Sequence, residues 1–561
     1  MDGILIIVGL IIAVLVIAWG VNKIRHPKSK DFAQKQATLE ALHATTQGAE
    51  HQVNTKVATT ALDVRFGLGT SRNKILIAMI FGMFIGVLNQ TLLNVALPKI
   101  NEDFNIEAST GQWLMTGFML VNGILIPISA YLFSKYTYRR LFLIAMTLFT
   151  IGSLVCGIAE NFPVMMTGRV LQAIGAGVLM PLGTNVFMSL FPPEKRGSAM
   201  GLMGIAMVLA PAIGPTLSGY IVQNYHWNIM FYGMFVIGAI ATILGMLWFK
   251  IYQHVENPKM DVFGVIFSTI GFGALLFGFS EAGQQGWTST IVMSTLITGA
   301  LFTLLFVIHE CKMKQPMLNF EVLKYSGFTL TAMINMIVVM SLFGGMILLP
   351  IYLQTLRGFT PLDSGLLLLP GALLMGVMGP FAGKMLDKFG IKPLAIIGLI
   401  IMTYANWELT KLSDDIAYGR ILWIYTVRSF GMSFIMMPIM TAGMNALPSR
   451  LVSHGNALVN TVRQLAGSIG TALLVTIMTM QTSNNVQAYQ HHLNGVNSHT
   501  REQIQHAAQH LTSESELAQF IQKLASINGI NTAFWFATAL SVLALLMSLF
   551  LKGKSHYLSQ E

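Results

Sequence analysis

Residues 130–140 read AYLFSKYTYRR, and residues 383–393 read GKMLDKFGIKP. Aligned without gaps, the two stretches match Lys135 with Lys388. Each is a short basic loop between long apolar segments, and repeats of this kind are typical of transporters built from two related halves. The pair of stretches therefore predicts a chain with two similar helical halves.

The composition is that of a membrane protein. Charged residues make up 10% of the 561 residues and hydrophobic residues 54%, whereas soluble globular proteins carry about 25% charged residues. Mean hydropathy is +0.63. So few charges could not cover the surface of a soluble protein of this size. The net charge of +10 does not indicate nucleic-acid binding, because the basic residues are scattered in short loops.

Fifteen segments are long and apolar enough to span a membrane as helices, which takes about 20 residues. Long continuous apolar runs indicate helices rather than a barrel, so we predict an all-α polytopic membrane protein. The segments are 4–21, 74–97, 111–134, 140–159, 163–190, 195–222, 227–251, 262–281, 289–310, 326–355, 360–386, 391–412, 419–447, 455–481 and 530–551.

The basic residues predict the orientation. One set of alternate loops carries 25 Lys and Arg, and the other carries six. The loops that carry more Lys and Arg are expected on the cytoplasmic side. We expect the protein to lie in the cytoplasmic membrane. The first span has its positive charges behind it, whereas a cleaved signal peptide has them in front. We therefore expect an anchor with the N-terminus outside and the C-terminus inside, with a cleaved signal peptide as the alternative.

These spans predict a definite domain organisation. A polar loop at 482–529 is expected outside, with one or two amphipathic helices. Its His506 and His510 could form a metal pair, but a solvated face is the preferred interpretation because no clear acidic partner is present, so we predict no metal site. The predicted units are an N-terminal anchor 1–21, a cytoplasmic linker 22–73, a six-helix bundle 74–251, two intervening helices within 252–325, a second six-helix bundle 326–551 and a tail 552–561.

Further motifs fall on these spans in a fixed order. They are LNQTLLNVALPKI (88–100), GRVLQAIGAGVLMP (168–181), LAPAIGPTLSG (209–219) and NTVRQLAGSIGTALL (460–474). With the two loops, they resemble the fourteen-span drug/proton antiporter family of the major facilitator superfamily, in the branch of the lincomycin-resistance pumps. The resemblance covers residues 74–551. Departures from the family pattern are Asn89 in place of the usual acid, Ala130, Ser134 and Thr137 in the first loop, and Ser218.

The resemblance implies a fold and two motif roles. It implies two six-helix bundles with two intervening helices, beside the extra N-terminal helix. The antiporter motif is carried by Gly214, Pro215 and Gly219, and it lines the interface between halves in the family; a plain packing helix is the alternative. The loop motif is implied to form a latch, with a charged loop that sets topology as the alternative, and its residues are Gly383, Asp387, Lys388, Gly390 and Lys392.

One polar cluster is predicted inside the first half. Arg169 lies about 9 Å inside its span at 1.5 Å per residue, a depth where a charge usually faces a cavity or a partner. Asn89 lies at a similar depth, and we expect Asn89, Gln90, Arg169 and Gln172 to come together in coupling or substrate binding. The alternative is an arginine that locks helices and is satisfied by backbone carbonyls.

Three charged residues of the second half complete the candidates. Arg428 and Arg463 also lie within spans, although Arg463 could instead snorkel to the cytoplasmic surface. Glu408 is the leading candidate for the proton site, because a carboxylate in an apolar cavity holds a proton more readily. The alternative is a Glu at the membrane surface that faces water.

The predicted function is proton-coupled efflux of lipophilic compounds by alternating access, with the proton gradient taken from the resemblance. No phosphate-binding loop or catalytic constellation is found, so we expect no ATP use, no enzyme activity and no cofactor. The expected substrates are lipophilic, neutral or weakly cationic small molecules, because acids are scarce inside the spans. The alternatives are export of a specific lipid, peptide or metabolite, and a non-transporting role. The sequence leaves open whether the protein has an adaptor partner.

Overall fold

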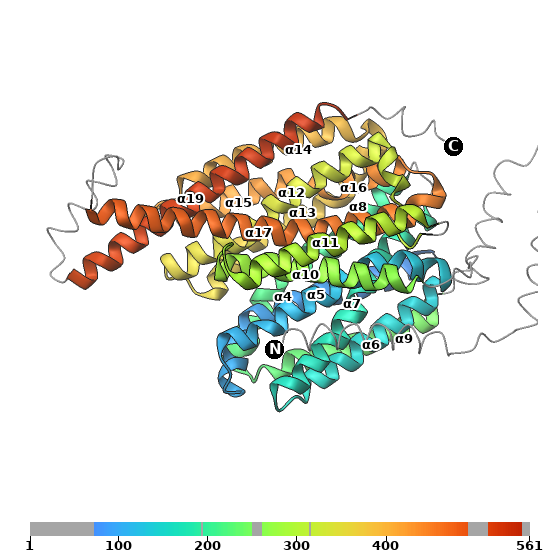
Figure 1. Cartoon of the computed structure of the whole chain (residues 1–561), viewed down its shortest axis with the longest axis horizontal. Coiled ribbons are helices and arrows are strands. Elements are labelled where there is room, and N and C mark those ends of the chain that lie inside the picture. Colours follow the sequence, from blue (N-terminus) through green and yellow to red (C-terminus); the bar gives the residue numbers. More distant parts are fainter. Residues whose placement is uncertain (1–71, 192–194, 250–260, 314–315, 492–513, 552–561) are drawn as a thin grey trace, which may run out of the picture.

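A computed structural model describes residues 72–191, 195–249, 261–313, 316–491 and 514–551, and almost all of them are helical (Figure 1). The predicted anchor 1–21, nearly all of the linker 22–73 and the tail 552–561 lie outside these residues. Thirteen helical stretches of the described chain are long and apolar enough to cross a membrane. A further long helix, α8, packs among them. These stretches and α8 correspond to the fourteen spans predicted after the anchor, and the fold class is confirmed.

The first half is a bundle of six helices. Helix α6 packs between α7 and α9, α5 packs on α7, and α4 packs on α8. Most of these helices lack a distinct polar face, as expected of helices that span a membrane within a bundle. Their bounds are α4 (Arg72–Asp103), α5 (Ala108–Lys135), α6 (Tyr138–Gly157), α7 (Phe162–Leu190), α8 (Arg196–Asn224) and α9 (Asn228–Trp248).

Two intervening helices follow. Helix α10 (Val262–Gln285) packs on α5 of the first half and on α17 of the second. Helix α11 (Thr290–Lys312) packs mainly on α10 and leaves most of its apolar surface uncovered by the protein. In Figure 1 the green pair runs between the blue-to-cyan and the yellow-to-red bundles. A short turn, η2 (Phe320–Lys324), leads to the second half.

The second half repeats the arrangement with one difference. The predicted span 419–447 is two helices, because the α-helical hydrogen bonding is interrupted near residue 434. The elements are α12 (Ser326–Pro350), the π-helical turn η3 (Ile351–Leu356), α13 (Pro361–Phe389), α14 (Ile391–Glu408), η4 (Leu409–Lys411), α15 (Tyr418–Ser433), α16 (Met436–Asn445), η5 (Ser449–Leu451), α17 (Val452–His491) and α19 (Glu514–Ser548).

Helices α17 and α19 are longer than predicted. At 1.5 Å per residue, the 40 residues of α17 span about 60 Å, twice a typical hydrocarbon layer of about 30 Å. The two helices project together from the bundle (Figure 1) and pack through Tyr489, Ile521 and Leu524. Much of the predicted loop 482–529 is therefore helical, while its residues 492–513, including His506 and His510, lie outside the described part. We call this end of the molecule the stalk end, and the opposite end, which carries the loops near 135–140 and 384–392, the basic end.

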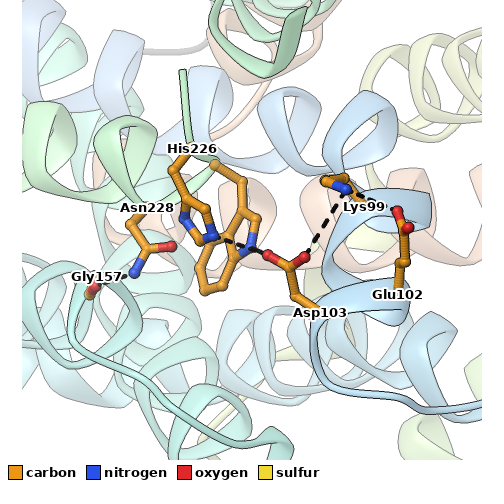
Figure 2. Close-up of polar contacts among 7 residues, drawn as sticks. Lys99, Glu102, Asp103, Gly157, His226 and Asn228 are labelled. Carbon is orange, nitrogen blue, oxygen red and sulfur yellow. Dashed lines mark hydrogen bonds and ion pairs between the residues drawn. The ribbon is translucent and has the colours of Figure 1, made fainter. Parts of the chain in front are cut away.

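Side chains tie the first half together at its stalk end (Figure 2). Asp103, at the end of α4, accepts a 2.7 Å hydrogen bond from Trp227 and lies 2.8 Å from His226, both just before α9. Asn228 donates to the carbonyl of Gly157 at the end of α6. These contacts join α4, α6 and α9 at one level.

Candidate functional site

The predicted cluster around Arg169 forms within the first half. The guanidinium donates to the Leu114 carbonyl on α5 (3.1 Å) and to Gln172 Oε1 (2.9 Å). Asn89 Nδ2 of α4 donates to the same Gln172 oxygen, and Gln172 Nε2 donates to Ser153 of α6. Four helices meet at this buried cluster, which we call the Arg169 cluster.

Arg169 is fully enclosed in its own half, with 1% of its surface exposed. The Phe118 ring lies 4.4 Å from the guanidinium carbon, a cation–π distance. Gln90, predicted to join, is half-buried and has no hydrogen bond among the described residues. The contacts of Arg169 match the helix-locking alternative, because its donors go to a backbone carbonyl and a neutral amide rather than to an open cavity.

Arg428 has a matching arrangement in the second half. Its Nε donates to Asn406 Oδ1 on α14 (2.8 Å), and its Nη2 donates to the Ser341 carbonyl on α12 (3.0 Å). Asn406 Nδ2 donates in turn to Ser541 of α19 and to the Ser341 hydroxyl. All four side chains are buried, and we call them the Arg428 cluster. In each half, an arginine on the fourth spanning segment is held by a carbonyl and an amide.

Asp387 of the loop motif connects the two halves. Its carboxylate accepts bonds from the backbone N–H groups of Gly197 and Ser198, each at 3.0 Å, and from the Ser198 hydroxyl at 2.6 Å. Gly197 and Ser198 begin α8, so the negative charge lies at the positive end of a helix dipole. We call this contact the Asp387 clamp.

The other residues of the loop motif have different positions. Gly383 lies against the Gly197 carbonyl, with no space for a side chain. Gly390 ends α13 with a φ of 80°, which favours glycine. Lys388 is exposed and stacks on Phe389, and Lys392 is half-buried; no ion pair to either is found in the described part of the chain.

Apolar contacts extend the closure between the halves at the basic end. Helices α8 and α13 pack along their lengths, and Gly201 and Gly379 let their backbones touch. Methionines of α8 and α16 belong to one buried cluster that crosses the boundary between halves: Met200, Met203, Met207, Met437, Met440 and Met444. Methionine side chains repack with little strain, so this seal suits an interface that opens and closes.

The antiporter motif lies on the stalk-end half of α8. Gly214 lies directly against Thr91 of α4, where a Cβ would collide with the hydroxyl. A Cβ on Gly219 would meet nothing within 4 Å. Pro215 lies between them in the same helix. Gly214 therefore sets a close contact within the first half, and Gly219 does not.

Glu408 and Arg463 differ in their surroundings. Glu408 pairs with Lys411 (2.6 Å) and Arg420 (3.3 Å) at the stalk end of α14. Glu408 therefore matches the alternative interpretation, an acid at the membrane surface. It belongs to neither the Arg169 cluster nor the Arg428 cluster. Arg463 lies deep in the protein on α17, is half-buried, and has no hydrogen bond or ion pair among the described residues.

Several residues of these clusters were not among the sequence candidates. Asn406 is one, and its polarity inside an apolar span is the signal that could have found it. Ser341, Ser541, Ser153 and Ser198 gave no such signal, because serine is common in membrane helices and their partners lie far away in sequence.

Comparison with known proteins identifies the family. The profile described as Major Facilitator Superfamily matches residues 79–471, which is more than half of the chain. The chain belongs to the major facilitator superfamily. Members of this superfamily are transporters and not enzymes, as predicted.

Relatives in this superfamily include transporters with resistance names. The chain is 48% identical over 491 residues to the uncharacterized transporter YhcA of Bacillus subtilis (strain 168), covering 85% of this chain and 92% of YhcA. It is 37% identical to the lincomycin resistance protein LmrB of Listeria innocua, covering 85% and 96%. The human organic anion transporter MFSD10 matches with a TM-score of 0.57 at 12% identity, over 85% of this chain and 99% of that one, and shows the same fold.

Proposed function

We propose that this transporter exports lipophilic compounds across the cytoplasmic membrane by alternating access, driven by the proton gradient. The basic end faces the cytoplasm in this proposal, in agreement with the distribution of Lys and Arg. The resistance name of LmrB supports a toxic lipophilic substrate. The N-terminus is proposed to lie outside, although the anchor falls beyond the described residues.

The observation that carries the proposal is the Asp387 clamp. Three donors at the start of α8 converge on one carboxylate of α13. The clamp holds the basic end closed with a few polar bonds and an apolar seal. Each half has its own buried polar cluster, so the halves can separate at the basic end as bodies and admit a substrate from the cytoplasm.

The experiment is uptake of lincomycin and ethidium into energised inside-out vesicles, with and without a protonophore. We expect uptake that the protonophore abolishes. Uptake that survives collapse of the gradient contradicts proton coupling. Absence of uptake of both compounds by folded protein contradicts lipophilic drug export and favours a specific lipid, peptide or metabolite.

A further inference from the structure

Arg463 lies well inside the apolar, membrane-spanning part of α17. It is eleven residues from the start of α17 at Val452, which is about 16 Å along a helix. The hydrocarbon layer is about 30 Å thick. Counted from the start of α17, the backbone of Arg463 therefore lies about halfway through a layer of this thickness. At this depth the side chain is half-buried rather than fully enclosed.

The face of α17 that carries Arg463 is turned to the first half. Asn456 lies two turns earlier on the same face and donates a 2.8 Å bond to the Pro181 carbonyl of α7. The neighbouring Gln464 lies against Gly123 of α5. Arg463 therefore lies at the boundary between the halves, where a transported compound passes in the proposed mechanism.

Arg463 differs from Arg169 and Arg428, whose donors are occupied by carbonyls and amides. No partner of Arg463 is found in the described chain, nor of the half-buried Gln464 and Asn122 nearby. Asn122 lies beside Gly123 on α5, next to Gly177 of α7. Hydrogen-bonding groups from α5 and α17 are thus free at a similar level.

No acidic side chain within the described spans lies at the level of Arg463. The acids of these spans lie near helix ends: Glu281, Glu310, Asp363, Asp387 and Glu408. Arginine keeps its charge inside proteins, and a charge in the membrane interior requires a partner or a watery cavity. The positive charge of Arg463 is therefore not neutralised by the protein residues described.

We propose that Arg463, assisted by Gln464 and Asn122, binds an anionic group of the substrate, so that the transporter selects lipophilic anions over lipophilic cations. The inference rests on the proposed export function. It ranks the substrates expected from the sequence by rate, because a cationic compound such as ethidium meets an uncompensated positive charge and is carried more slowly than an anion, although it is still carried.

The test compares two probes in inside-out vesicles: 1-anilinonaphthalene-8-sulfonate, a lipophilic anion, and tetraphenylphosphonium, a lipophilic cation. The wild type is expected to take up the anion faster. In Arg463→Gln, the anion-to-cation rate ratio falls by at least about tenfold, since the attraction of a buried charge is lost. Arg463→Lys keeps the preference for the anion. Arg450→Gln is the matched control, because its side chain is 66% exposed, and its ratio stays unchanged.

The outcomes separate a binding role from a structural one. Equal loss of both rates in Arg463→Gln, or a ratio within twofold of the wild type, overturns the proposal. Wild-type preference for the cation also overturns it. Wild-type protein that transports neither probe also overturns the proposed anion preference. Lincomycin uptake by the same vesicles would then show that the proposed export function still holds.

Discussion

The polar contacts of the arginine clusters inside each half are buried, whereas the polar contacts between the halves at the basic end are only partly buried. Inside each half, a buried arginine is joined to other helices by neutral partners, with Arg169 in the first half and Arg428 in the second. Between the halves at the basic end, a partly exposed carboxylate, Asp387, meets a helix start beside a methionine seal. Buried networks are costly to break, whereas the clamp is reached by water and can exchange its bonds. This difference supports the proposal that each half moves as a unit and that the interface between the halves opens at the basic end.

The largest expected effect comes from breaking a cluster inside a half. Arg428→Ala leaves Asn406 and the Ser341 carbonyl without their donor, and each orphaned buried group costs about 1–3 kcal/mol. We expect a loss of about 3 kcal/mol of stability, measured by thermal unfolding in detergent. Protein that stays folded should still transport. Unchanged stability would show that the cluster does not hold the half together.

Breaking the clamp is expected to shift the protein toward the form that is open at the basic end, without unfolding either half. Asp387→Asn removes charge-assisted bonds worth about 1.5–3 kcal/mol each, so the ratio of closed to open protein falls at least about tenfold. A cysteine placed at Met437, which is 5% exposed, should then react faster with maleimide from the basic side. Lys384→Gln is the control, since this exposed side chain takes no part in the clamp. An equal labelling rate in Asp387→Asn and the control would refute the clamp.

A smaller effect separates two glycines of α8. Gly201→Ala forces a Cβ against the Gly379 backbone of the other half, while Gly219→Ala adds one where nothing lies within 4 Å. We expect transport to fall about fivefold in Gly201→Ala, because close helix approach depends on small residues. Gly219→Ala should remain within about twofold and gain slightly in helix propensity. Comparable loss in both variants would mean that α8–α13 contact does not control transport.

Apolar length and loop charge predicted most of the fold from sequence. Continuous runs such as 163–190 match α7 closely, because a membrane-spanning helix that packs among other helices is apolar along its whole length. Amphipathic helices were expected in the segment 482–529, but the sequence did not reveal that they continue α17 and α19, because beyond the membrane a helix is no longer continuously apolar. The interruption near residue 434 lies within an apolar run and gives no change in hydropathy.

The candidate site was predicted unevenly. The expected contacts among Arg169, Gln172 and Asn89 are present. Polar side chains at the same depth of an apolar bundle hydrogen-bond to one another because no other partners are available there. The loop resemblance pointed to Asp387, but its partner Ser198 is 189 residues away and only tertiary structure brings it there. Glu408 was predicted from its span alone, and its ion pair with Arg420 depends on a loop whose path the sequence does not reveal.

The most direct test of the account measures distances between spin labels on the two halves, with Cys311 replaced by serine because it is exposed. One pair, at Arg139 and Lys384, spans the basic end, and the other, at Glu102 and Arg420, spans the stalk end; all four side chains are exposed. Asp387→Asn is expected to lengthen the first distance and to shorten the second. Distances that stay as in the wild type at both ends would contradict the claim that the clamp governs the movement of two rigid halves.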